Sequence, residues 1–227
     1  MKTKIFTFVL LWMTILTGCK KDFSEINTNI NNPVDVEPDL LLRQVIYDLG
    51  ENMSYEGFVT GNLLGQHFSM VDFNLFDRHS LTQPQLGGNP WPVLYKNLRD
   101  NELILQKVES DPIYAVYEGP ARILKAFMAQ TLTDLFGPIP YSEALQGVGG
   151  NVTPVYDSQE SVYLAEDGII DQLDKAIAAI DAYNAPQTLG GDIFYNGDLS
   201  KWRKLAKSLK IKALIRISDR DNEIALD

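Results

Sequence analysis

Apolar residues recur at steps of three and four along most of this chain, a spacing that places them on one side of an α-helix. The last such segment carries Trp202, Leu205, Leu209 and Ala213 at these steps. Sustained alternation of apolar and polar residues, which is typical of a half-buried strand, is scarce. We therefore predict helices over residues 38–55, about 58–72, 91–110, 112–136 and 158–182, and a last helix that begins at Asp198 or Ser200.

Proline and glycine mark the ends of these helices. Asp111-Pro112 separates two of them, and Gly137-Pro138 ends the second. Pro120 lies inside the predicted helix over 112–136, so we expect a kink there or a later start. Residues 77–92 are rich in proline and glycine and are predicted to form a long loop. The order of the segments favours an all-α fold of antiparallel helix pairs, like those stacked in α-solenoids, with long irregular loops.

Residues 134–144 are the most distinctive run in the chain. Gly137 ends a helix, and two prolines then force an extended connector. Nucleophilic catalysis would need a base beside Ser142, and no histidine lies near it in the sequence. We interpret the run as a rigid corner.

Within residues 192–202, Asp192, Asn196-Gly197 and Asp198 resemble parts of a calcium-binding loop. The alternating Asp/Asn spacing and the closing Glu of such a loop are missing. We therefore predict a turn followed by a helix cap.

The start of the chain has the pattern of a bacterial lipoprotein signal. Lys2 and Lys4 precede an apolar stretch over 5–16, which is too short for a spanning helix of about 20 residues. Leu16-Thr17-Gly18-Cys19 matches a lipobox, in which cleavage after Gly18 leaves Cys19 to carry acyl chains. An ordinary signal peptide with a chance cysteine and a buried apolar helix are the alternatives. The expected organisation is a leader over 1–18, a flexible polar tether over 19–37 and a helical domain over 38–227.

Charge and composition exclude several classes of protein. The formal net charge is −10 at pH 7, from 20 Lys and Arg against 30 Asp and Glu, which disfavours nucleic-acid binding. The single cysteine, Cys19, excludes an intramolecular disulfide framework and a cysteine-based zinc finger. His67 and His79 fit no metal-binding spacing, and we expect neither a metal nor a cofactor.

The last predicted helix concentrates positive charge. We favour a solvated helix face over a docking face for an acidic partner or for phosphate. The basic residues are Lys201, Arg203, Lys204, Lys207, Lys210, Lys212 and Arg216.

Aromatic residues gather in and beside the loop over 77–92. Exposed rings there would stack on the apolar faces of sugar rings, while polar side chains bond to the hydroxyl groups. The alternative is that Trp91 and Tyr95 pack the first turn of a helix into the core. The candidate ligand-binding residues are Trp91, Tyr95, Phe76, Asp77 and Arg78, with Phe73, Asn89 and Asn97 nearby.

Three separated blocks resemble the SusD/RagB family of surface lipoproteins of glycan-degrading bacteria. The first is Cys19 with Lys21–Asn29 and Asn31–Pro33, and the second is Ala129–Ala144. The third runs from Tyr195 through Gly197-Asp198 and Lys201-Trp202 to Arg216–Ser218.

The resemblance implies a fold of tetratricopeptide-like helix pairs, lipid-anchored through Cys19 on the outer face of the outer membrane. It also implies that the protein binds oligosaccharides or polysaccharides and passes them to a TonB-dependent transporter of the SusC type, without catalysis of its own. It covers only the N-terminal, helix-pair half of the family, so we expect the domain over 38–227 to be incomplete at its C-terminus.

We therefore interpret the chain as a glycan-capturing outer-membrane lipoprotein. The competing hypotheses are a helical-repeat scaffold lipoprotein without a sugar site and a surface glycosidase. A glycosidase would require two carboxylates facing one cleft.

Overall fold

A computed structural model of the chain describes residues 35–72, 76, 78–79 and 89–220. The chain divides into two units, residues 1–36 and 37–227, and the second is described below. The leader over 1–18 and most of the predicted tether, including Cys19, lie outside the described residues. Within the described residues the structure is helical, and the β structure consists of one isolated bridge between Ile139 and Asp157. The predicted all-α fold is confirmed.

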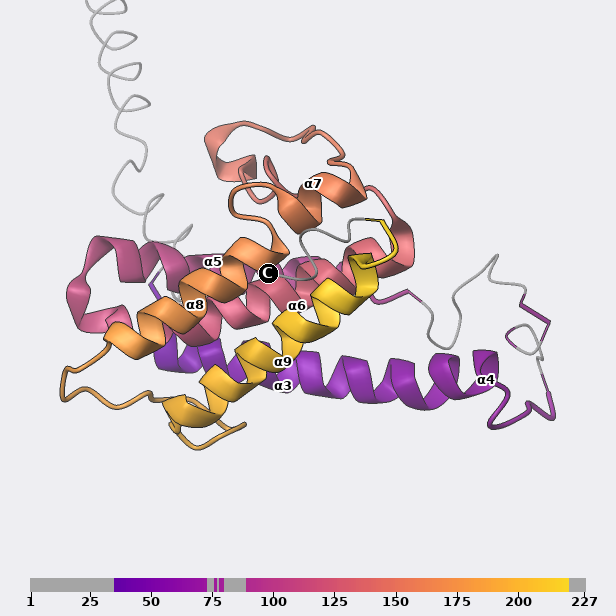
Figure 1. Ribbon diagram of the computed structural model, residues 1–227, viewed down its shortest axis with the longest axis horizontal. Helices are drawn as coiled ribbons and strands as arrows, with labels where there is room; N and C mark the ends of the chain where they lie inside the picture. The colour runs from indigo at the N-terminus through magenta and orange to yellow at the C-terminus, as the bar shows by residue number, and fades with distance from the viewer. Residues whose placement is uncertain (1–34, 73–75, 77, 80–88, 221–227) are drawn as a thin grey trace, which may run out of the picture. The chain divides into compact units, whose positions relative to one another are not determined.

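The first two predicted helices form one continuous helical segment, which ends earlier than predicted. Helix α3 (Pro38–Glu56) runs through a π-helical stretch, η1 (Gly57–Gly61), into the short helix α4 (Asn62–Leu64) (Figure 1). The separate helix predicted over 58–72 is therefore wrong in both its limits. It ends at Leu64 because the backbone turns at Gly65 and enters the left-handed region at Gln66, with φ of 57°.

Helix α5 (Trp91–Ser110) packs antiparallel to α3. Lys96, in the second turn of α5, pairs with Asp48 near the middle of α3 at 2.7 Å. Beyond the C-terminal end of α5, the Tyr114 hydroxyl donates to Glu37, just before α3 begins. The predicted bounds of α5 agree with the structure.

Helix α6 (Glu118–Phe136) follows a 3-10 helix, η2 (Pro112–Tyr117). Pro120 therefore falls in the first turn of α6, where a missing N–H costs no helical hydrogen bond. The structure confirms the later start that Pro120 predicted. Gly119, next to it, lies so close to α8 that an added Cβ would be 2.4 Å from Cγ1 of Ile180.

The helix predicted over 158–182 is two helices, α7 (Gln159–Leu164) and α8 (Ile169–Ala182). The Ser158 hydroxyl caps α7 by accepting from the Ser161 N–H. The chain then turns sharply, and a Cβ at Gly168 would lie 2.8 Å from the carbonyl oxygen of Ala165. The apolar spacing continues across this turn, which is why periodicity alone predicts a single helix.

Helix α9 (Leu199–Ile217) lies against α6 and α8 and carries the basic residues (Figure 1). Arg203 and Lys210 donate to Asp181 and Asp174 of α8, so part of the basic face is paired with acids of the same chain. The remaining short helix, η3 (Gly147–Gly149), lies in the connection between α6 and α7. Among the described helices, none is long and apolar enough to span a membrane.

The buried carboxylate of Asp192 organises the turn before α9. It accepts from the backbone N–H groups of Phe194, Tyr195 and Gly197 at 2.8–3.0 Å. It also accepts from the indole N–H of Trp202 at 2.8 Å, and Trp202 is fully buried. Asp198 then caps α9 through the N–H groups of Ser200 and Lys201. The predicted turn and helix cap are thus what these acids form.

We expect Asp192→Ala to reduce the free energy of unfolding by about 3 kcal/mol or more, because it leaves the buried Trp202 N–H and three turn N–H groups without their acceptor. Urea unfolding measures this difference. Asp174→Ala, which removes an exposed pair with Lys210, serves as the control and is expected to cost less than about 1 kcal/mol. Equal losses in the two variants would contradict the role of Asp192.

Candidate functional site

Four aromatic side chains from three segments meet where α5 begins and α6 ends. We call Trp91, Tyr95, Phe136 and Tyr156 the aromatic platform. Trp91 is the first residue of α5, and its ring lies 4.8 Å from that of Tyr95, one turn further along. Both are half-buried. The structure thus brings together two of the predicted ligand-binding residues.

Phe136 and Tyr156 complete the platform. Phe136, the last residue of α6, meets Trp91 edge to face, with centroids 5.1 Å apart and planes at 86°. Tyr156 lies nearly parallel to Trp91, with centroids 6.4 Å apart and planes at 22°. Tyr156 is 65% exposed and Phe136 is 38% exposed, so aromatic surface faces solvent. Sequence reasoning assigned neither residue to the site.

The corner over 134–144 is held to the segment that carries Tyr156 by one carboxylate. Asp157 accepts from the backbone N–H groups of Tyr141 and Ser142, at 3.0 and 2.8 Å, and from the Ser142 hydroxyl. Its own backbone pairs with that of the fully buried Ile139 in the isolated bridge. The predicted rigid corner is therefore present, and Ser142 serves it as a hydrogen-bond donor.

The same hydrogen bonds set the charge of this carboxylate. Partial burial acts to raise the pKa of Asp157, but the hydrogen bonds from Ser142 and Tyr141 outweigh it. The pKa of Asp157 therefore lies below its ordinary value, and the carboxylate is ionised at neutral pH.

A hydrogen bond from Tyr95 also links the platform to the corner. The Tyr95 hydroxyl donates to the carbonyl oxygen of Pro140 at 2.7 Å. Burial, with the nearby Tyr156 and Asp157, raises the pKa of the Tyr95 phenol well above its usual value. The phenol therefore remains a neutral donor at neutral pH, and its ring is fixed in orientation.

The other residues proposed from the sequence lie in different surroundings. Phe76 is buried, with 6% of its surface accessible, so its ring is not open for stacking. Arg78 is exposed, and Asp77 lies outside the described residues. Asn97 is fully buried, which removes it from contact with a ligand, whereas Asn89 is exposed.

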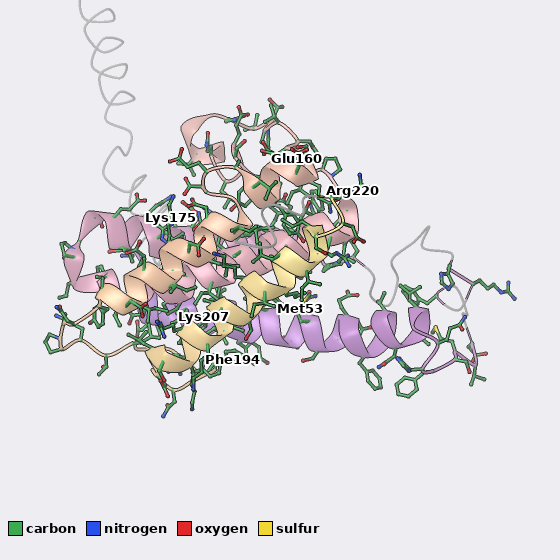
Figure 2. The ribbon with its side chains drawn as sticks, viewed as in Figure 1. Met53, Glu160, Lys175, Phe194, Lys207 and Arg220 are labelled. Atoms are coloured by element: carbon green, nitrogen blue, oxygen red, sulfur yellow. The ribbon has the colours of Figure 1, made fainter. Side chains whose placement is uncertain are left out.

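Two further depressions have walls that do not include Trp91. A polar cleft of about 520 Å³ is lined by residues from α7 and from the C-terminal ends of α6 and α9. Glu160 and Arg220 are two of its lining residues (Figure 2). A smaller apolar groove of about 190 Å³ includes Met53 of α3 and Phe194 before α9 (Figure 2). Across the described part of the chain, no group of three or more His, Cys, Asp or Glu side chains is arranged to hold a metal ion.

The polar cleft bears on the glycosidase hypothesis, because the carboxylates of Asp134 and Glu160 both line it. Asp134 already accepts from the Tyr163 hydroxyl at 2.7 Å and lies 3.5 Å from Arg216. Burial and the bond to Asp134 raise the pKa of the Tyr163 phenol, so that phenol is a neutral donor at neutral pH. This arrangement resembles a structural network and offers no specific support for hydrolysis.

Comparison with known sequences and structures places this geometry in context. A protein family described as SusD-like, starch-binding associating with outer membrane, matches residues 30–227. No curated protein matches the sequence. A SusD/RagB family protein from Bacteroides thetaiotaomicron superposes with a TM-score of 0.66 at 23% identity, over 82% of this chain and 39% of that one.

Two other solved structures give similar superpositions. A SusD homologue from Bacteroides fragilis has a TM-score of 0.65 at 24% identity, over 83% of this chain and 39% of that one. A chitin-binding protein has a TM-score of 0.66 at 28% identity, over 83% of this chain and 41% of that one. The chain thus spans about two fifths of the length of these proteins. Its helix pairs have the tetratricopeptide-like arrangement of the SusD fold, as predicted.

We expect Asp157→Asn to be less stable than the parent at pH 7. The folded-state pKa of Asp157 lies below the unfolded value of about 3.9, so its contribution is complete above that pH and is lost as the pH falls through the folded-state value. Urea unfolding between pH 7 and strong acid should show the gap closing at low pH. Glu109→Gln, at an exposed position of α5, is the control. A gap for Asp157→Asn that persists unchanged into acid would contradict the assignment.

Proposed function

Because the chain belongs to the SusD-like family, we propose that it captures oligosaccharides by stacking them on the aromatic platform. The observation that carries the proposal is the exposed aromatic surface formed by Trp91, Phe136 and Tyr156. Exposed apolar patches rimmed by polar groups are typical of binding sites, and aromatic rings offer flat faces to the C–H faces of sugars.

Preorganisation supports this use of the platform. The Tyr95 hydroxyl donates to the carbonyl oxygen of Pro140. Asp157, the residue after Tyr156, accepts hydrogen bonds from the corner and so holds the backbone next to Tyr156. A ring that is already oriented loses little conformational freedom when a ligand stacks on it. The platform would therefore bind sugars reversibly, and the proposal is for a binding protein without catalysis.

The ligand class follows from charge and from the relatives. The formal net charge of −10 disfavours acidic glycans, because like charges repel. The family is described as starch-binding, and one structural neighbour is a chitin-binding protein. We therefore place neutral hexose or N-acetylhexosamine oligosaccharides first among the ligands.

Anchoring and delivery complete the proposal. Cys19 would carry acyl chains that hold the protein on the outer face of the outer membrane, and two or more chains make such anchoring stable. Bound glycan would pass to a TonB-dependent transporter of the SusC type. The competing scaffold hypothesis keeps the anchor and lacks the sugar site, so the two are distinguished by sugar binding.

We expect Trp91→Ala to weaken oligosaccharide binding by about two- to tenfold, the usual value of an aromatic contact. Isothermal titration calorimetry with maltoheptaose and chitohexaose measures the change. Trp91 also packs on Tyr95, so its removal can affect folding as well as binding. Tyr156→Ala therefore serves as a second variant, because the Tyr156 ring is exposed and its removal should have little effect on folding.

Trp91→Phe keeps a ring at this position and should retain most of the affinity. Unchanged affinity in both Trp91→Ala and Tyr156→Ala would refute the platform as the sugar contact. A parent protein that binds neither sugar would favour the scaffold hypothesis.

We expect Cys19→Ala to abolish incorporation of labelled palmitate in the producing cells and to release the protein from the membrane fraction, because the acylated side chain is gone. Labelling followed by fractionation checks both. Lys21→Ala is the matched control and should stay labelled and membrane-bound. A parent protein that is secreted without label would overturn the anchor.

A further inference from the structure

The long helical segment that begins with α3 changes its geometry before it ends. Five residues, Gly57–Gly61, form the π-helical stretch η1 between α3 and α4. Such stretches are rare and are frequently found at functional sites. Phe58 lies within η1 and is 65% exposed.

The chain then reverses direction through a defined motif. The His67 N–H donates to the Asn62 carbonyl at 2.9 Å, and the Gln66 N–H donates to that of Leu63 at 3.1 Å. This pair of bonds is the Schellman motif, which requires a left-handed residue after the helix end. Gln66 takes that conformation, although glycine is the usual residue there. Gly65 leaves room for the reversal, since a Cβ on it would lie 3.2 Å from the His67 ring.

The reversal returns Phe68 to Phe58. Their rings meet edge to face, with centroids 5.7 Å apart, and Phe68 is 53% exposed. Beside them, a shallow cleft of about 390 Å³ is lined by Gln66, His67, Phe68 and Ser69. We call Phe58 and Phe68 with these cleft residues the arm tip. It combines exposed rings with amide, imidazole and hydroxyl groups, which are the chemical groups that bind sugar faces and sugar hydroxyls.

The arm tip lies toward the same end of the α3–α5 pair as the platform. Asp48 of α3 and Lys96 of α5 are paired, and the two helices are antiparallel. At 1.5 Å per residue, Trp91 lies about 7.5 Å from that pair along the axis and Phe58 lies about 15 Å from it in the same direction. The arm tip therefore lies further along the helix axis than Trp91, in the direction in which an extended ligand stacked on Trp91 could continue.

From this placement we infer that the arm tip is a second contact for the same oligosaccharide, engaged only by chains long enough to extend past the platform. The inference rests on the proposed function, because it takes its ligand from there. Phe58 and Phe68 would stack on sugar faces, and Gln66 and His67 would bond to hydroxyl groups. The arm tip would thus select for chain length.

The test is a calorimetric comparison of short and long ligands. Phe58→Ala and Phe68→Ala should weaken binding of maltoheptaose or chitohexaose by about two- to tenfold and leave that of maltotriose or chitotriose unchanged. Both rings are exposed, so the thermal unfolding curve should not move. Tyr47→Ala removes an exposed ring elsewhere on α3 and should leave both affinities unchanged.

The outcomes separate this inference from the proposed function. Long-chain affinity equal to the parent in both Phe variants would overturn the second contact while leaving the platform in place. Equal weakening of short and long ligands would also overturn it, because the arm tip would then belong to the first sugar position. A third outcome is that Phe58→Ala and Phe68→Ala weaken long-chain binding while Trp91→Ala and Tyr156→Ala keep the affinity of the parent. That result would refute the platform and keep the arm tip as the sugar contact. A parent protein that binds none of the four sugars would refute the proposed function itself.

Discussion

Close packing around α6 is the constraint on which the described structure depends. This helix contacts α5, α7, α8 and α9. At Gly119 the approach to α8 leaves no room for a Cβ beside Ile180, and Ala121 and Ala129 are fully buried further along. Small residues let helices approach closely and fill their interface, and tightly packed interiors transmit a misfit to their neighbours. The position of α6 therefore determines where its last residue, Phe136, meets α5.

A second constraint acts where α6 ends. Gly137 takes a positive φ of 76°, which turns the chain out of the helix, and the corner that follows is held by the ionised Asp157. The Tyr95 hydroxyl reaches the same corner at Pro140. Helix packing and one carboxylate thus hold the backbone segments that carry the rings of the platform. Rigid aromatic surface of this kind suits a protein that captures and releases a ligand without changing it.

Much of the fold could be predicted because it depends on local signals. Proline and glycine set the limits of α5 and α6, and Ser158 and Asp198 cap the helices that follow them. The turn at Gly168 could not be predicted, because the apolar spacing on its two sides continues in phase. The sequence does not indicate the end of α4 for a different reason: Gln66 adopts a left-handed conformation that its residue type disfavours.

The candidate site divides in the same way. Trp91 and Tyr95 are one helical turn apart, so their proximity follows from the sequence. Tyr156 is far from both along the chain, and its segment is held beside the corner by the bonds of Asp157 to Ile139, Tyr141 and Ser142, which no periodicity encodes. The position of Phe76 beside the proline- and glycine-rich loop predicts an exposed ring, and tertiary packing buries it.

The most direct test of sugar stacking on Trp91 is a two-dimensional NMR titration that follows the indole N–H signals as maltoheptaose or chitohexaose is added. The indole of Trp202 is buried and bonded to Asp192, so it is an internal reference. We predict that the Trp91 signal moves with saturable dependence on sugar concentration while the Trp202 signal stays in place. A Trp91 signal that does not move while calorimetry reports binding would contradict the account.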